Sequence, residues 1–182
     1  MKHINLLGLT LFFGLFTYCQ QTTNNTQTVA QNWKLLDEKG YSVQYPENWD
    51  LDPSGQMGTS FAIFSKKTSE QDPFRENVNL LIQDMKGMGI DLDKYVEISE
   101  GQVKTMTNNG KILESKRLSS NGIEFQKMIY TSQQGNYLLK FEQYYWVKQE
   151  KAFVLTLTCE AREFDNYRTT GEKILNSFRF KK

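Results

Sequence analysis

Histidine is almost missing from this sequence. The only one among 182 residues is His3, and it lies in a segment that we expect to be removed as a leader. A mature protein without imidazole cannot use Ser-His-Asp or Cys-His catalytic systems or histidine-ligated zinc. Many hydrolase classes are therefore excluded, and we predict no catalytic residue and no enzyme.

Cysteine is nearly as rare. Cys19 ends an apolar leader, and Cys159 lies in a late apolar run. Two cysteines placed in this way form neither a C-x-x-C redox pair nor a plausible structural disulfide. Cys159 shares a predicted strand face with Phe153, Leu155 and Leu157, so we interpret it as a small core side chain and not as a reactive thiol.

An excess of charge is also missing. The sequence has 22 Lys and Arg against 21 Asp and Glu, a formal net charge of +1. Removal of Lys2 with the leader leaves 1 − 1 = 0, so no broad electric field attracts nucleic acid or anionic lipid, and we expect no nucleic-acid partner. The length and the 38% hydrophobic composition suit one well-buried domain.

The chain begins with a leader. Lys2 and His3 precede an apolar run from Ile4 to Tyr18, which is shorter than the ~20 residues that span a bilayer as a helix. A short basic segment followed by such a run is typical of an export signal. We therefore predict that residues 1–18 are a signal peptide.

Cys19 is the predicted lipidation site. The segment Leu15-Phe16-Thr17-Tyr18-Cys19 resembles a bacterial lipobox, which implies cleavage before the cysteine and attachment of a diacylglycerol to its thiol. Phe16 and Tyr18 stand where lipoboxes favour leucine and a small residue. Two alternatives stay open, namely ordinary secretion with cleavage after Thr28-Val29-Ala30 and an uncleaved anchor.

The predicted tether follows. Gln20 to Thr28 contains no apolar residue, so we expect residues 19–32 to be a disordered connection between the lipidated cysteine and a domain formed by residues 33–182. The membrane is therefore a predicted partner, which the protein contacts through the lipid on Cys19. We expect the protein in the bacterial cell envelope, anchored to a membrane and facing the periplasm.

Period-2 alternation predicts that most of the domain is β-strand. Tyr41, Val43 and Tyr45 alternate with polar residues before Pro46, which lacks the N–H that a strand ladder needs. Short turns with glycine or charged residues favour sequential antiparallel pairing. Residues 50–59 read as a loop. The predicted strands are residues 33–37, 41–45, 61–65, 77–85, 111–119, 123–132, 137–147 and 152–160.

Two helices are predicted from apolar spacings of three and four. The first carries a stripe from Leu92 to Met106 with Asp91 as N-cap, and the second a stripe from Phe164 to Phe178. Residues 178–180 suit a last pairing at a sheet edge. Each stripe needs a sheet face to cover it. We therefore predict an α+β fold, a central antiparallel sheet of about six to seven strands with helices on both faces.

The order of these features resembles a known family. The segment from Tyr41 to Trp49, then Asn77-Val78-Asn79-Leu80, a mid-chain helix, an antiparallel meander and a last helix ending in Ser177-Phe178 are similar to PsbP-like domains, which include PsbP and DcrB-like bacterial envelope lipoproteins. The resemblance covers residues 33–180. It implies an α/β/α sandwich and a role in docking to other proteins, and it supplies no metal or cofactor motif.

One strand face is the candidate binding surface. Tyr144 and Trp146 share a face of the predicted strand with Lys140 and Glu142, a mixture of aromatic and charged side chains that suits a protein interface. If a helix covers this face, the same residues form a second core layer. Trp49 and residues 53–59 could similarly form the rim of a cleft, and we interpret them as turn structure.

Acidic side chains offer one further possibility. Asp91, Asp93 and Glu97 could together bind a hard cation. Their spacing lacks the D-x-D-x-D-G pattern of a calcium loop, and acids at the start of a helix have a role in capping. We interpret them as capping residues and predict neither a metal nor a cofactor.

Three functions fit the sequence. The first is a lipid-anchored, non-enzymatic module that binds or stabilises an assembly with an unidentified envelope protein. The second is a carrier of a small apolar ligand between sheet and helix, for which an aromatic-lined pocket would be the distinguishing feature. The third is an enzyme that works through carboxylates alone, which would need convergent acids in a cleft.

Overall fold

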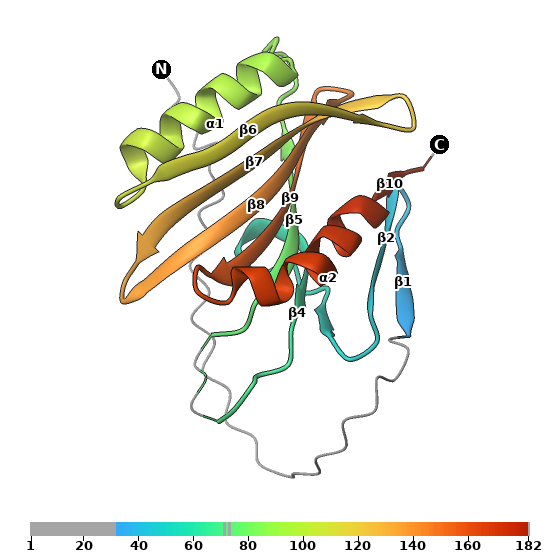
Figure 1. Cartoon of the computed structure of the whole chain (residues 1–182). Coiled ribbons are helices and arrows are strands. Elements are labelled where there is room, and N and C mark those ends of the chain that lie inside the picture. Colours follow the sequence, from blue (N-terminus) through green and yellow to red (C-terminus); the bar gives the residue numbers. More distant parts are fainter. Residues whose placement is uncertain (1–31, 71, 73, 182) are drawn as a thin grey trace.

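The computed structural model describes residues 32–70, 72 and 74–181 (Figure 1). The predicted signal peptide, Cys19 and all but the last residue of the predicted tether lie outside these ranges. Within them the chain forms ten strands, two α-helices and a short 3-10 helix. No helix in the described part of the chain is long and apolar enough to cross a membrane.

Seven strands form one large antiparallel sheet (Figure 1). From edge to edge the order is β3 (Asp50–Asp52), β4 (Thr59–Phe64), β5 (Asn77–Asp84), β9 (Lys151–Glu160), β8 (Tyr137–Lys148), β7 (Ile123–Gln134) and β6 (Lys111–Ser120). Strands β6 to β9 are the predicted meander, since each pairs with the next along the chain. The turns use a left-handed backbone at Asn121, Gly122, Gly135, Gln149 and Glu150, as tight hairpins require.

A second, three-stranded sheet has the order β1 (Trp33–Asp37), β2 (Tyr41–Pro46) and β10 (Arg179–Phe180). The predicted hairpin of β1 and β2 is confirmed, and it lies outside the large sheet. In β10, Phe180 pairs with Tyr41 and Arg179 with Ser42, which confirms the predicted edge pairing. The two ends of the described chain therefore meet in one small sheet.

Helices cover both faces of the large sheet, so the predicted α+β fold is confirmed (Figure 1). On one face α1 (Leu92–Met106) packs Tyr95 and Val103 against Met128 and Tyr145. On the other face α2 (Phe164–Ser177) and the small sheet bury a larger core. Its members include Tyr41, Val43, Tyr45, Trp49, Leu155, Leu157, Cys159, Ile174 and Leu175.

The helix ends follow from local chemistry. Asp91 caps α1 as predicted, because its Oδ1 accepts a hydrogen bond of 2.8 Å from the backbone nitrogen of Lys94. In α2, Gly171 lies against the sheet: a Cβ added there would be 2.4 Å from Leu157 Cδ2. The absence of a side chain at this position lets helix and sheet approach closely.

The predicted loop over residues 50–59 was wrong in part. Its first three residues form β3, in which Asp50 pairs with Phe64, and Gln56–Gly58 form the 3-10 helix η1. The Asp50 carboxylate also binds the side chains of Lys66 and Arg75. A strand of three residues is too short to show periodicity, and distant partners fix it.

Candidate functional site

The predicted binding face of β8 is covered in the folded protein. Tyr144, Trp146, Glu142 and Lys140 do share one face, but Tyr144 is 4% exposed, Trp146 7% and Glu142 0%. Lys140 is half-buried, with Nζ 4.0 Å from the ring centroid of Phe164 in α2. This face is therefore a second core layer, and the prediction that it is an open binding surface was wrong.

A group of charges lies between this face and α2, with Lys127 and Glu142 buried and Arg168 exposed. Lys127 Nζ is 2.7 Å from Glu142 Oε1 and 3.2 Å from Glu172 Oε1. Arg168 Nε is 3.1 Å from the same oxygen of Glu172. The charges therefore compensate one another where the helix closes over the sheet.

Burial and pairing set the protonation of this group. Burial raises the pKa of Glu142, and Lys127 opposes that rise. Burial would lower the pKa of Lys127, but attraction to Glu142 and Glu172 outweighs it and raises the pKa. Because no solvent reaches Glu142, this carboxylate cannot contact a substrate in the folded protein.

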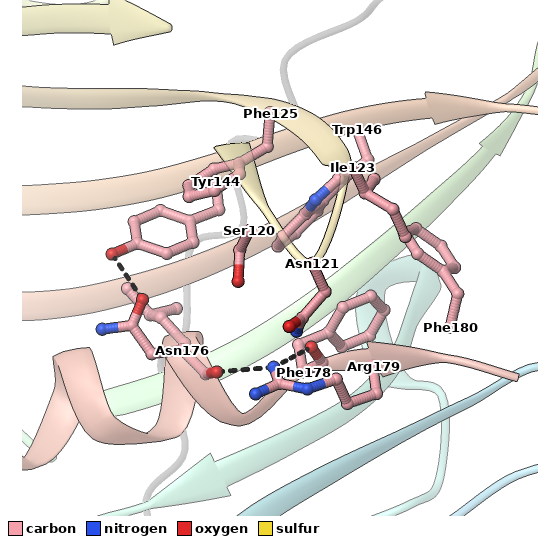
Figure 2. A pocket seen from close by; sticks show the side chains of 11 residues that line it. Ser120, Asn121, Ile123, Phe125, Tyr144, Trp146, Asn176, Phe178, Arg179 and Phe180 are labelled. Atoms are coloured by element: carbon pink, nitrogen blue, oxygen red, sulfur yellow. Dashed lines mark hydrogen bonds between the residues drawn. The ribbon is translucent and has the colours of Figure 1, made fainter. Parts of the chain in front are cut away.

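Beside the charges lies a pocket of about 160 Å³ (Figure 2). It opens between the β6–β7 turn, the strands β7 and β8, and the chain from the end of α2 into β10. Its apolar lining consists of Ile123, Phe125, Tyr144, Trp146, Leu175, Phe178 and Phe180, and its polar lining of Ser120, Asn121, Asn176 and Arg179.

Tyr144 connects the sheet wall of the pocket to the helix. Its hydroxyl donates to Asn176 Oδ1 at 3.3 Å (Figure 2). Burial raises the pKa of Tyr144, and the neighbouring carboxylates of Glu142 and Glu172 raise it further. The phenol therefore stays neutral and can act as a donor throughout the physiological pH range.

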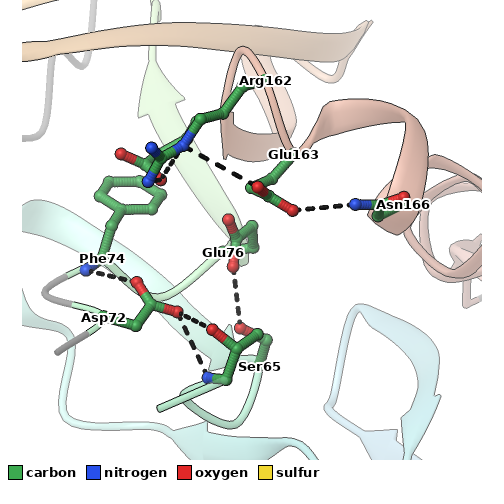
Figure 3. Close-up of polar contacts among 9 residues, drawn as sticks. Ser65, Asp72, Phe74, Glu76, Arg162, Glu163 and Asn166 are labelled. Carbon is green, nitrogen blue, oxygen red and sulfur yellow. Dashed lines mark hydrogen bonds and ion pairs between the residues drawn. The ribbon is translucent and has the colours of Figure 1, made fainter. Parts of the chain in front are cut away.

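A second polar cluster lies near the start of α2 (Figure 3). The Asp72 carboxylate accepts from the backbone nitrogen of Phe74 at 3.2 Å, and the Ser65 hydroxyl donates to Glu76 Oε2 at 3.3 Å. Burial raises the pKa of Glu76. These contacts hold the connection between β4 and β5. Among the described residues, no group of three or more His, Cys, Asp or Glu is placed to hold a metal ion.

The other predicted candidates have structural partners. Asp91 caps α1, Lys94 Nζ pairs with Glu97 at 2.8 Å, and Asp93 binds Arg117. These acids therefore serve the helix and its contact with β6. Cys159 is fully buried, and burial raises the pKa of its thiol, which agrees with its interpretation as a core residue.

Sequence reasoning missed most of the pocket. The sequence places Phe178 at the end of a helical stripe and residues 178–180 at a sheet edge, and it gives Phe125 no role in a site. The alternation Phe178-Arg179-Phe180 after an amphipathic helix was the available signal, because it places two rings on one face of a strand. Nothing in the sequence indicated that this face would meet Trp146.

The sequence model of the family described as PsbP-like protein matches residues 3–180. The chain belongs to this PsbP-like family. The match extends over every helix and strand of the described chain, so the resemblance expected from the Tyr41–Trp49 segment and the meander is confirmed. No curated protein matches the sequence.

Solved structures of low sequence identity share the fold of this PsbP-like protein. Cyanobacterial PsbP (CyanoP) from Synechocystis has a TM-score of 0.63 at 14% identity, covering 88% of this chain and 98% of its own. LpqN of Mycobacterium tuberculosis, described as involved in cell envelope biogenesis, has 0.59 at 12%, covering 85% and 93%. PA94 of Pseudomonas aeruginosa, a putative regulator by its description, has 0.58 at 10%, covering 80% and 94%.

Proposed function

We propose that this PsbP-like protein is a lipid-anchored envelope protein whose domain is a non-enzymatic binding or stabilising module for a larger protein assembly. Family membership over residues 3–180 carries the proposal, because PsbP-like proteins generally act by binding and not by catalysis. The description of LpqN as involved in cell envelope biogenesis supports the location. The predicted lipid on Cys19 supplies the anchor.

The proposal predicts that the protein is part of a complex in the membrane. Tagged full-length chain, extracted with a mild detergent and passed over a size-exclusion column, is expected to elute well above the size of the chain alone in its micelle. The same extract after mild urea treatment, which separates subunits before it unfolds stable domains, is expected to elute at the smaller size.

Cys19→Ala is the matched control for that experiment. It removes the expected anchor and leaves the domain unchanged, so a complex that needs membrane attachment should be lost while the protein stays folded. Elution of the wild-type chain as a free protein under all extraction conditions would contradict the assembly role.

A second candidate function is the binding of a small ligand between sheet and helix. The pocket at Tyr144 and Trp146 favours it, because that pocket has the predicted aromatic lining. Its volume of about 160 Å³ is well below the roughly 300–1,000 Å³ of sites for drug-sized ligands. Such a site suits a compact ligand and not the transport of a long lipid.

A further inference from the structure

Five aromatic rings from two distant parts of the chain form the walls of the pocket (Figure 2). Phe125 lies 4.8 Å from Tyr144 and 5.5 Å from Trp146, measured between ring centroids. Trp146 is in turn 5.0 Å from Phe178, which is 5.1 Å from Phe180. Each ring is held by its neighbours, so the apolar surface of the pocket is formed before any ligand arrives.

The only charged side chain in the lining of this pocket, among the described residues, is a cation, and the nearby carboxylates of Glu142 and Glu172 are paired with Lys127 and Arg168. The eleven described residues that line it include Arg179 and no carboxylate. Lys148 adds a second cation nearby, with Nζ 4.7 Å from the ring centroid of Phe180. An anionic ligand would therefore be attracted to the pocket, and a cationic one repelled.

Arg179 is already oriented. Its Nη1 donates to the backbone carbonyls of Asn176 and Phe178, each at 2.7 Å (Figure 2). Within the described part of the chain, its Nε and Nη2 have no hydrogen-bond partner and no acid pairs with it. The remaining edge of a guanidinium carries parallel N–H donors that match the two oxygens of a carboxylate.

The volume of the pocket limits the ligand. An apolar cavity of roughly 150 Å³ binds benzene, and the pocket measures about 160 Å³. One six-membered ring therefore fits among the aromatic walls, and a charged substituent of that ring would lie at the rim with Arg179.

We propose that the pocket binds a small monocyclic aromatic carboxylate, with its ring against the aromatic wall formed by Phe125, Trp146 and Phe178 and its carboxylate on Arg179. This inference rests on the second candidate function, ligand binding at the pocket, and adds the chemical class of the ligand. The docking role does not depend on it.

The test uses phenylacetate and its neutral analogue phenylacetamide as probes. The full-length chain is labelled with 5-fluorotryptophan and placed in bilayer nanodiscs, so that its three tryptophans give separate ¹⁹F signals. Phenylacetate is expected to shift the Trp146 signal and to leave those of Trp33 and Trp49 unchanged. Phenylacetamide is expected to bind about tenfold more weakly, because it cannot form the charged pair with Arg179.

Substitutions separate charge from shape. Arg179→Ala is expected to weaken phenylacetate binding about tenfold and to leave phenylacetamide binding unchanged. Arg162→Ala removes an exposed arginine that precedes α2, at the opposite end of the helix, and is expected to change the binding of neither probe.

Ser120→Phe fills the mouth of the pocket and is expected to abolish binding of both probes. Ser119→Phe is its control, because the neighbouring side chain points to the other face of β6.

The outcomes distinguish the two levels of the proposal. Equal binding of both probes, in wild type and in Arg179→Ala alike, would overturn the carboxylate and leave the ligand-binding function standing. No shift of the Trp146 signal with either probe up to its solubility limit would overturn the ligand class and the ligand-binding function together.

Discussion

At the scale of single residues, Lys127 and Glu142 decide how the group of charges between β8 and α2 affects stability. Both side chains are buried, at 7% and 0% exposure, and their charged atoms are 2.7 Å apart. A buried ion pair adds little net stability relative to an apolar pair, yet loss of one partner is costly because the other charge stays uncompensated. Substitution of Lys127 in β7 or of Glu142 in β8 alone should therefore lower the stability of the folded protein.

Lys127→Met is expected to lower the free energy of unfolding by about 3 kcal/mol at neutral pH. The folded pKa of Glu142 is raised above its ordinary value of 4.5, so its protonated form favours folding, and stability is lost as the pH rises through the folded pKa. Without Lys127 that pKa rises further. Urea unfolding should therefore show a smaller effect at pH 4 than at pH 7.

Two variants complete the measurement on Lys127. The double variant Lys127→Met with Glu142→Leu is expected to recover most of the lost stability, because it removes the uncompensated charge. Lys104→Met, at a lysine with 62% exposure, should have little effect. A loss in Lys127→Met that is equal at pH 4 and pH 7 would contradict the role assigned to Glu142.

At the scale of elements, the two helices differ in how closely they approach the sheet. Gly101 lies inside α1, and a Cβ built there meets no atom within 4 Å. Gly171 lies inside α2, and its added Cβ would be 2.4 Å and 2.8 Å from the two methyl carbons of Leu157. Glycine is an unfavourable helix residue in both places, and only in α2 does packing require it.

The same substitution should consequently act in opposite directions. Gly101→Ala is expected to raise the free energy of unfolding by about 0.5–1 kcal/mol, because alanine restricts the unfolded chain and suits a helix. Gly171→Ala is expected to lower it by about 1–3 kcal/mol, because Leu157 is fully buried and must move. Equilibrium unfolding in urea measures both. A stabilising effect of equal size at Gly171 would show that the contact between α2 and the sheet is loose.

At the scale of the whole molecule, the small sheet separates the first residues of the described chain from the pocket. The described chain enters at Asn32 and begins β1 at Trp33, which pairs with Pro46. Arg179 pairs with Ser42, whose other neighbour is Asp37 at the far end of β1. Trp33 and Asp37 are four residues apart along β1, and at about 3.3 Å per residue these two ends of the strand are roughly 13 Å apart. Arg179 and the pocket that it lines therefore lie at the end of the small sheet away from Trp33.

Attachment through Cys19 is testable on the whole chain. Labelled palmitate is expected to be incorporated into the wild-type protein and to be lost in Cys19→Ala, since the predicted lipid needs that cysteine. The Cys159→Ala variant is the matched control and should keep the label, because Cys159 is buried in the core. An unlabelled wild-type chain would rule out the lipid anchor.

The sequence alone determined what depends on local pattern. Alternating residues and turn chemistry fixed the meander of β6 to β9, the spacing of apolar residues fixed both helices, and Asp91 marked the start of α1. It also determined that Tyr144 and Trp146 share a face. These features are predictable because strands, turns and caps depend on residues close together in the chain.

The tertiary structure decided which of those faces stays open. α2 and β10 cover the Tyr144 and Trp146 face, bring Phe178 and Phe180 against it, and leave a pocket of about 160 Å³ with Arg179 at its rim. The same packing placed β1 and β2 in a separate sheet and made β3 from three residues. All of these depend on contacts between segments far apart in the chain, for which a local pattern carries no signal.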